Sequence, residues 1–373
     1  MSVDFTIAVD TFRPLVERVK RVVEKRNTVP ILSNVCVTAA KDGQLTLTGT
    51  DLDIWATAAT PGIHVHSPGA VTVPATLLFD ILRKASGDMR FCDTGEGRVT
   101  LQSGRAKFSL NALPVEDFPD MAASEASARF DLAPQTLTRI AACCSFAIST
   151  EETRYYLNGI YLHPAEGGDA LVAVATDGHR LSRVAIERPG VPPFAGIIIP
   201  RKMVGLFDLV ASVCKGGEAV RIAVDASRIV FETAALVLAS KLIDGTYPDY
   251  QRVIPAGHPI TADVPRESLA DAIERVTTIT AERGRGVSFA FSRDALRLSI
   301  ADPGQGSAED EVACGFNHDD MTIGFNGRYA RDALATFPGE RMLLALADPG
   351  SPAVLTDPGD ESRLVVLMPM RVA

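Results

Sequence analysis

The sequence lacks the features of membrane-spanning, secreted and zinc-stabilised proteins. No uninterrupted apolar run approaches the roughly 18 residues that a membrane-spanning helix needs. The opening residues, MSVDF, lack the basic, apolar and small-residue order of a signal peptide. The six cysteines are scattered without a C-x-x-C pair, a pattern typical of buried free thiols in a reducing compartment and not of a structural zinc site. We therefore expect a soluble, cytoplasmic protein.

The sequence also lacks a nucleotide-binding signature and an excess of positive charge. Gly284 and Gly286 flank Arg285, but no phosphate-loop motif surrounds them, so we expect no cofactor. The formal net charge of −9 argues against nucleic-acid binding unless the basic residues are segregated on one surface. The apolar fraction of 46% is ordinary for a globular protein, and 373 residues suggest two or three domains.

One order of elements occurs three times along the chain. Apolar spacing predicts a first helix in each copy, at residues 9–26, 134–148 and 265–279. A second helix is expected to open at Pro74, Pro200 and Asn326, which lie 126 residues apart. Alternating or apolar segments predict strands at residues 31–39, 45–59, 99–113, 157–163, 171–186, 220–224, 229–242, 287–291, 295–300, 342–347 and 364–370.

Three copies of one α+β domain explain this pattern better than two unlike domains. The first two copies also end on related segments, LPVEDFPD at 113–120 and LIDGTYPD at 242–249. Each copy is expected to pack two helices on one face of a mostly antiparallel sheet. The predicted domain limits are 1–125, 126–256 and 257–373, with boundaries in short polar or Pro/Gly-containing segments.

The positive charge is concentrated in the predicted helices. Those six segments together carry a formal charge of +5, which leaves −14 on the rest of the chain. If the helices share one surface, that surface suits a phosphate backbone without reading base sequence. Basic residues on helices are also common on ordinary solvated faces, and the first helix of the third copy is negative.

A hairpin near the middle of the chain gathers chemically active side chains. The apolar run 171–175 predicts a buried strand, and Asp177-Gly178 supplies the turn that lets a second strand fold back. Asp177, His179 and Arg180 at this bend could form an active site with Ser182 or Thr176, a binding rim, or simply a turn. Catalysis is disfavoured because no Gly-rich oxyanion loop or second acid-base partner is present.

A pair of histidines, His64 and His66, is a candidate metal site. His64 and His66 share a strand face, but no Cys, Asp or Glu at ligand spacing joins them. We therefore expect a surface strand there and no metal.

The repeat and a set of short motifs resemble the family of bacterial DNA polymerase III beta subunits, the DNA sliding clamps. The resemblance covers essentially the whole chain. The motifs are TVPILSN (28–34), LTGTDL (47–52), RYYLNG (154–159), ATDGHRL (175–181), IPRK (199–202), SKLIDG (240–245), YPDY (247–250) and MPMR (368–371). Eight motifs in this order are hard to obtain by chance.

The resemblance implies a processivity factor and not an enzyme. The expected assembly is a head-to-tail homodimer, six domains in a ring whose helices line a hole around duplex DNA. By similarity, the interface residues are Arg105, Lys107 and Phe108 in the first domain, against Thr278, Ile279 and Arg285 in the third. A divergent clamp paralogue with a specialised repair or resistance role is the alternative, and a hydrolase using Asp177 and His179 is less favoured.

The resemblance further implies a cleft between the second and third domains. Short peptides of the DNA polymerase III alpha subunit, the clamp loader and other clamp-binding proteins are expected to dock there. The corresponding residues are Leu157, Thr176, Gly178, His179, Arg180, Leu181, Pro248, Arg252, Val253, Val366, Met368, Pro369 and Met370. The Leu, Val and Met side chains would form an adaptable apolar pocket, and the two arginines could meet acidic groups or carbonyls of the peptide.

Contacts with double-stranded DNA, without sequence specificity, are the last implication. Arg26, Tyr155, Tyr156, Arg201 and Lys202 are the expected DNA-binding residues. Two positions depart from the family pattern. The family that this chain resembles has a basic residue at the position of Thr76 and a glutamine at the position of Glu151. Glu151 and Glu152 should make the local surface more repulsive to phosphate.

Overall fold

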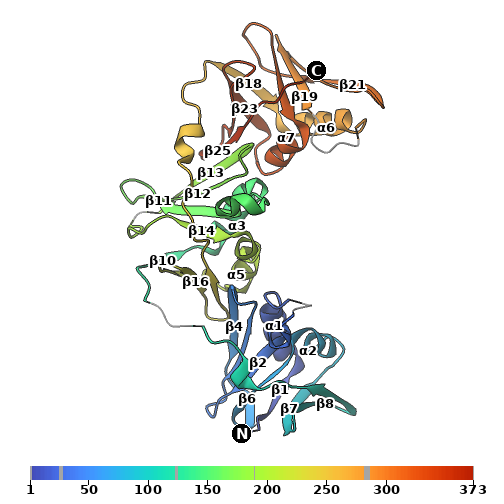
Figure 1. Cartoon of the computed structure of the whole chain (residues 1–373), viewed down its shortest axis with the longest axis vertical. Helices are drawn as coiled ribbons and strands as arrows, with labels where there is room; N and C mark the ends of the chain where they lie inside the picture. The colour runs from blue at the N-terminus through green and yellow to red at the C-terminus, as the bar shows by residue number, and fades with distance from the viewer. Residues whose placement is uncertain (1, 25–27, 122–124, 189, 281–285, 373) are drawn as a thin grey trace. The chain divides into compact units, whose positions relative to one another are not determined.

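The structure is a computed structural model of the 373-residue chain, and it describes residues 2–24, 28–121, 125–188, 190–280 and 286–372. The chain divides into two compact units, Met1–Thr138 with Gly205–Leu242, and Arg139–Val204 with Ile243–Ala373. Figure 1 shows the chain coloured along its sequence. Each unit is built from antiparallel sheets and short helices, as the α+β prediction required.

The first unit contains two sheets. The five-stranded sheet has the order β5 (His64–Ser67), β1 (Asp4–Ala8), β7 (Asp88–Gly95), β8 (Arg98–Ser103) and β9 (Ala106–Asn111). The eight-stranded sheet has the order β10 (Ala128–Leu132), β15 (Val220–Val224), β16 (Arg228–Glu232), β17 (Val237–Lys241), β4 (Ile54–Thr60), β3 (Leu45–Thr50), β2 (Asn34–Ala39) and β6 (Gly69–Pro74). The pairing of β4 with β17 joins the first and second repeats in one continuous sheet.

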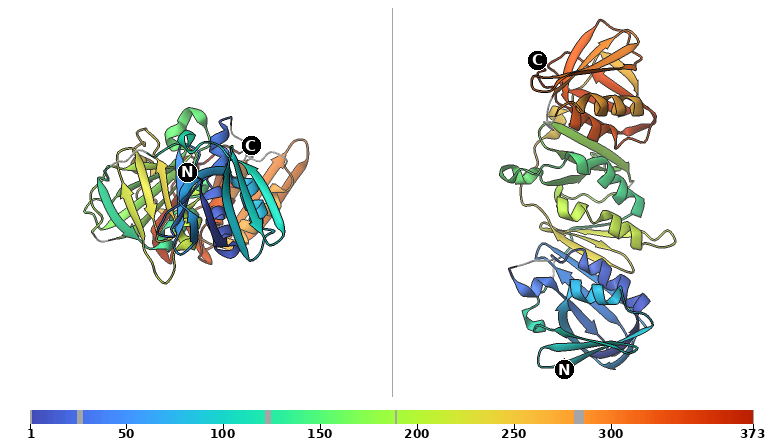
Figure 2. Two further views of the ribbon diagram at one scale, coloured as in Figure 1. Left: turned by 90° about the horizontal axis from the view of Figure 1, so that it is seen from below. Right: turned by 90° about the vertical axis from the view of Figure 1, so that its right-hand side faces the viewer.

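The helices of the first unit are amphipathic and cover these sheets. They are α1 (Val9–Lys20), α2 (Ala75–Leu82) and α5 (Phe207–Val213), with 3-10 turns η1 (Pro30–Ser33) and η2 (Val115–Asp117). Helix α1 buries Phe12, Leu15 and Val19 on one face, and the Phe12 ring meets the rings of β1 and β7 edge-on. Helices α1 and α2 lie side by side, as the right-hand view of Figure 2 shows.

The second unit repeats the arrangement. Its eight-stranded sheet has the order β14 (Ile197–Pro200), β11 (Gly159–Pro164), β12 (Ala170–Thr176), β13 (Arg180–Glu187), β25 (Asp360–Leu367), β24 (Ala353–Asp357), β23 (Arg341–Leu346) and β18 (Ile260–Pro265). Its four-stranded sheet has the order β21 (Gly306–Ala313), β20 (Ala295–Asp302), β19 (Gly286–Ser292) and β22 (Met321–Asn326). Here β13 pairs with β25 and joins the second repeat to the third.

The remaining helical elements start where the repeat predicts. They are α3 (Pro134–Cys144), α4 (Arg201–Val204), α6 (Arg266–Thr277) and α7 (Gly327–Leu334), with 3-10 turns η3 (Ser145–Ala147), η4 (Glu152–Leu157) and η5 (Tyr250–Val253). Helices α2, α4 and α7 each begin one residue after the equally spaced positions Pro74, Pro200 and Asn326. Helices α6 and α7 pack together against a core rich in phenylalanine.

Several predicted boundaries were wrong. Helix α1 ends at Lys20 and not at Arg26, whose position lies outside the described residues. Residues 30–33 form a 3-10 turn before β2, because Pro30 starts a helical turn and offers no donor to a sheet. The expected strand 45–59 is two strands, β3 and β4, separated by a tight turn around Leu52.

Helix α3 ends at Cys144 and continues as the 3-10 turn η3, and not as one helix to Ile148. The helix predicted after Pro200 is interrupted between Val204 and Phe207. The last strand, β25, ends at Leu367 because the chain then leaves its sheet and Met370 donates its N–H to the Gly324 carbonyl of β22. Strands β1, β6, β7, β10, β14, β18, β21, β22 and β24 were not predicted.

Candidate functional site

The turn between β12 and β13 is fixed by its own side chains. The Asp177 carboxylate accepts hydrogen bonds from the backbone N–H groups of His179 and Arg180, both at 3.0 Å. The Thr176 hydroxyl donates to the Arg180 carbonyl at 2.7 Å and accepts from the Gly178 N–H at 3.1 Å. Gly178 has a φ of 88°, a conformation that glycine adopts without steric cost. The turn is therefore a rigid platform.

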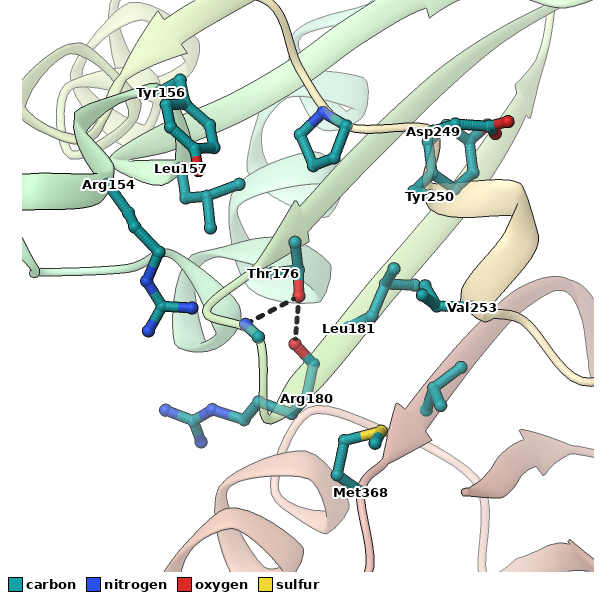
Figure 3. A pocket seen from close by; sticks show the side chains of 13 residues that line it. Arg154, Tyr156, Leu157, Thr176, Arg180, Leu181, Asp249, Tyr250, Val253 and Met368 are labelled. Carbon is teal, nitrogen blue, oxygen red and sulfur yellow. Dashed lines mark hydrogen bonds between the residues drawn. The ribbon is translucent and has the colours of Figure 1, made fainter. Parts of the chain in front are cut away.

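A pocket of about 290 Å³ opens beside this turn. Figure 3 shows side chains from the turn, η4, η5 and the end of β25 directed into one hollow. The lining residues are Arg154, Tyr156, Leu157, Thr176, Gly178, Arg180, Leu181, Pro248, Asp249, Tyr250, Val253, Val366 and Met368. The pocket thus joins parts of the second repeat to the last strand of the third repeat within one compact unit.

The pocket walls are apolar and partly open to solvent. Leu157, Leu181 and Val366 are buried in the same hydrophobic cluster, and Leu181 is the register partner of Val366 across β13 and β25. In contrast, Val253 is 50% exposed and Met368 is 42% exposed. Exposed apolar side chains that continue a buried apolar wall are typical of a surface that binds apolar groups of a partner.

An aromatic cluster supports the wall formed by η5. The Tyr161 and Tyr247 rings stack at 4.7 Å, and the Tyr250 hydroxyl lies 2.9 Å from His163 Nε2. Burial raises the pKa of Tyr247 far above its usual range, so this phenol stays neutral. These contacts position Tyr250, which packs in the hydrophobic cluster, has its hydroxyl beside His163 and also lines the pocket.

The charged groups beside the turn are already paired within the protein. Arg154 donates two hydrogen bonds to the Glu151 carboxylate, at 2.8 and 2.6 Å, and the bond from Arg154 lowers the pKa of Glu151. The Arg154 guanidinium also covers Gly178, where an added Cβ would lie 2.6 Å from Nη1. A side chain at position 178 would therefore displace Arg154 from the pocket rim.

Arg180 links the turn to helix α7. Its Nε donates to Asp177 at 3.0 Å and its Nη1 donates to Asp332 at 2.8 Å. The guanidinium carbon lies 4.3 Å from the Tyr329 ring centre, and the side chain is 8% exposed. Figure 3 shows the guanidinium directed away from the hollow. Arg180 therefore connects the second repeat to the third by binding the carboxylates of Asp177 and Asp332. We had expected its charge to contact a bound peptide instead.

We expect Asp332→Ala to destabilise this unit, because it leaves the buried Arg180 with Asp177 as its remaining carboxylate partner. The free energy of unfolding should fall by roughly 1–3 kcal/mol, the usual cost of removing one partner from a partly buried charged hydrogen bond. Chemical denaturation measures the change. Asp320→Ala, at an exposed position beside β22, is the matched control and should unfold like the parent. Equal stability of the two variants would contradict the role assigned to Arg180.

Comparison with known proteins agrees with this arrangement over the whole chain. Three family descriptions of the DNA polymerase III beta subunit match, the N-terminal domain at residues 3–122, the central domain at 131–249 and the C-terminal domain at 251–371. The chain belongs to the DNA polymerase III beta subunit family. This family is the beta sliding clamp, a processivity factor and not a catalytic enzyme.

Individual relatives are similar over nearly their full length. The beta sliding clamp of Caulobacter vibrioides is 39% identical over 361 residues, covering 95% of this chain and 96% of the relative. That of Escherichia coli K12 is 34% identical, covering 93% and 94%. A crystal structure of the sliding clamp from Bartonella birtlesii, bound to griselimycin, has a TM-score of 0.95 at 40% identity, with all of both chains covered. A Pseudomonas aeruginosa clamp has a TM-score of 0.92 at 32% identity, covering 99% of this chain and all of the other.

Nine of the residues expected in the clamp's peptide cleft lie around this one pocket: Leu157, Thr176, Gly178, Arg180, Leu181, Pro248, Val253, Val366 and Met368. Four other lining residues, Arg154, Tyr156, Asp249 and Tyr250, were not on the expected list. The motifs RYYLNG and YPDY contain all four, so their position beside Leu157 and Pro248 was the signal available in the sequence.

The other four expected cleft residues do not line this pocket. The His179 ring faces the Tyr329 ring at 6.0 Å, and exposed Arg252 pairs with Asp249 at 2.9 Å. Pro369 is half-buried and follows the pocket residue Met368. Met370 packs over Gly286 and Gly324 of the four-stranded sheet.

The residues expected at the DNA and dimer interfaces are exposed or half-buried where the structure describes them. Tyr155, Arg201 and Lys202 are exposed and Tyr156 is half-buried, whereas Arg26 lies outside the described residues. In or beside β9, Arg105 and Lys107 are exposed and Phe108 is half-buried. Thr278 and Ile279 follow α6. Arg285 also lies outside the described residues.

The geometry also bears on chemistry at the turn. The Asp177 carboxylate is occupied by two backbone N–H groups and by Arg180, which leaves it no part in a dyad with His179. Within the described residues, no group of three or more His, Cys, Asp or Glu side chains could hold a metal ion. In the same residues, every helix is too short or too polar to cross a membrane.

Proposed function

We propose that this clamp acts as a homodimeric ring that encircles duplex DNA and tethers the replicative polymerase and other DNA-processing proteins. Membership of the beta sliding clamp family over essentially the whole chain carries the proposal. For the three clamp domains we propose the limits 1–125, 126–256 and 257–373. The proposal has three parts: ring closure, passage of DNA and docking of partners.

Ring closure is supported by two exposed sheet edges of opposite charge. β9 ends the five-stranded sheet of the first unit, and β21 ends the four-stranded sheet of the second unit. Arg105 and Lys107 are exposed at β9, whereas Glu309 and Glu311 are exposed on β21. An exposed edge strand tends to pair with another chain. Pairing β9 of one copy with β21 of a second copy would satisfy both edges, and a twofold axis would repeat the contact and close a ring.

Passage of DNA is supported by basic helical segments. Arg18 and Lys20 lie in the last turn of α1, and Arg201 and Lys202 open α4. Glu151, one of the departures from the family pattern, is neutralised locally because Arg154 binds it with two hydrogen bonds. Its repulsion of phosphate should therefore be weaker than its charge alone suggests.

Docking of partners is supported by the pocket. A rigid turn, apolar walls and two exposed apolar side chains suit an extended peptide with bulky apolar residues, and a methionine at the rim can adapt to different partners. The proposed ligands are short segments of the DNA polymerase III alpha subunit, the clamp loader and other clamp-binding proteins.

The central test combines sedimentation across a dilution series with retention of labelled protein on primed circular DNA, with clamp loader and ATP present. We expect a dimer that remains on closed circles and is lost when the circles are cut, because a ring that holds DNA topologically slides off a free end. A protein that sediments as a monomer at all concentrations and is never retained would contradict ring closure.

A further inference from the structure

The turn beside the pocket has a copy in the first repeat. Asp51 accepts the N–H groups of Asp53 and Ile54 at 3.0 and 2.7 Å, just as Asp177 accepts those of His179 and Arg180. The Thr50 hydroxyl accepts the Leu52 N–H at 2.9 Å, as the Thr176 hydroxyl accepts that of Gly178. Residues 50–54 thus repeat the three side-chain hydrogen bonds that accept backbone N–H groups in residues 176–180.

The surroundings of the turn are copied as well. The Lys241 N–H donates to the Asp53 carbonyl at 2.8 Å, and the Met368 N–H donates to the His179 carbonyl at 2.9 Å. Trp55 is the register partner of Ala239, as Leu181 is of Val366. A 3-10 turn precedes the first strand of the sheet in both copies, η1 before β2 and η4 before β11. The turn hydrogen bonds and the strand register relate the pocket positions 178, 181, 366 and 368 to Leu52, Trp55, Ala239 and Lys241. Alignment of the related segments that begin at residues 113 and 242 relates positions 248 and 250 to Pro119 and Met121, and alignment of the two 3-10 turns relates position 154 to Val29.

The copied positions carry exposed apolar side chains. In the described part of the chain, seven large apolar side chains are exposed. Two of them, Val253 and Met368, line the pocket. Three more, Val29 at 47%, Leu52 at 40% and Met121 at 42%, occupy the copied positions. We call Val29, Leu52, Trp55, Met121 and Lys241 the first-repeat surface.

Leu52 has an unfavourable backbone conformation. Its φ is 78°, the left-handed region in which Gly178 stands without strain, and a bulky residue there costs folding free energy. A glycine would satisfy the turn equally well, so local folding does not require the leucine side chain. An exposed leucine at a position where its backbone is strained is consistent with contact between that side chain and a partner.

The charge of the copied surface differs from that of the pocket. Val29 and Ile54 replace Arg154 and Arg180, Asp53 replaces His179, and Lys241 replaces Met368, while an aspartate is kept at 51 and 120 as at 177 and 249. The formal charge over these positions changes from zero to −2. Lys241 is already 3.2 Å from the Asp53 carboxylate.

We propose that the first-repeat surface is a second docking site, for an extended peptide segment that has bulky apolar side chains flanked by basic ones. The apolar groups would contact Val29, Leu52 and Met121, and the basic groups would meet the exposed carboxylates of Asp53 and Asp120. The two sites would then select partners of different charge, because the pocket positions lack this negative surplus.

Trp55 provides a direct test, because it is the chain's single tryptophan and lies in this surface. Its emission should change saturably on titration with a capped lysine-leucine-lysine-leucine-phenylalanine peptide, and the same peptide with glutamate for lysine should bind at least about tenfold more weakly. Leu52→Gly removes the apolar contact and relieves the strained φ, so it should fold normally and weaken the lysine peptide by about tenfold.

Matched variants separate this site from the pocket. Met368→Ser should leave the Trp55 titration unchanged, and Leu52→Gly should leave binding of pocket peptides and retention on circular DNA unchanged. No emission change up to about 1 mM lysine peptide, equal affinity of the two peptides, or an unaltered titration of Leu52→Gly would overturn the second site. None of these results would contradict the peptide docking proposed for the pocket.

Discussion

Reversing the charge of Arg105 and Lys107 together to glutamate is expected to convert the dimer to monomers at concentrations where the parent is dimeric. Both side chains are exposed beside the edge of β9, and the proposed partner edge, β21, presents Glu309 and Glu311. Four like charges would then face one another at each of two symmetry-related contacts. Like-charge juxtaposition costs several kcal/mol, so the dimer dissociation constant should rise by at least about 100-fold.

The controls separate this interface from a general effect of net charge. Lys41→Glu with Arg221→Glu makes the same change in charge at exposed positions away from β9 and should leave the dimer intact. Adding Glu309→Lys and Glu311→Lys to the β9 variant exchanges the charges across the contact and should restore dimers and retention on circular DNA. Sedimentation across a dilution series reads each result. An undiminished dimer in the β9 variant, or failure of the charge exchange to restore one, would show that these edges do not form the closing contact.

Val253→Asp combined with Met368→Asp is expected to abolish most peptide docking while leaving the ring assembled. Both side chains are exposed in the free protein, so the fold tolerates the change, but a bound peptide would desolvate two carboxylates in an apolar pocket. The affinity for a polymerase-derived peptide should fall by about 100-fold or more, which corresponds to about 2.7 kcal/mol. Fluorescence polarisation of a labelled peptide measures this directly.

The control for the pocket is Leu77→Asp, which places a single added carboxylate on an exposed apolar position of α2. Its peptide affinity should equal that of the parent. The double pocket variant should still sediment as a dimer and remain on circular DNA, yet fail to support processive synthesis by the polymerase. Parental peptide affinity in the double variant would remove the pocket from the proposed function and leave ring closure unaffected.

Local patterns in the sequence determined much of the fold. Apolar residues at helical spacing placed α1, α3 and α6, and the equal spacing of Pro74, Pro200 and Asn326 identified the threefold repeat. Asp177-Gly178 marked the turn between β12 and β13, because a glycine at φ 88° and an aspartate that accepts nearby backbone N–H groups are local requirements. These features depend on neighbours within a few residues, which is why a sequence pattern records them.

Only the tertiary structure decided which side chains meet. Arg180 pairs with Asp332, which lies 152 residues away in the sequence, so the guanidinium charge is neutralised within the protein. No local sequence pattern indicates this pairing. Tyr250 lines the pocket because His163 and the stacked tyrosines hold it there, and Met370 leaves the last strand because its N–H pairs with Gly324. The types of residue available for the pocket and the threefold repeat can be recognised from the linear sequence. The pocket arises where β13 meets β25, because long-range pairing brings the two repeats together.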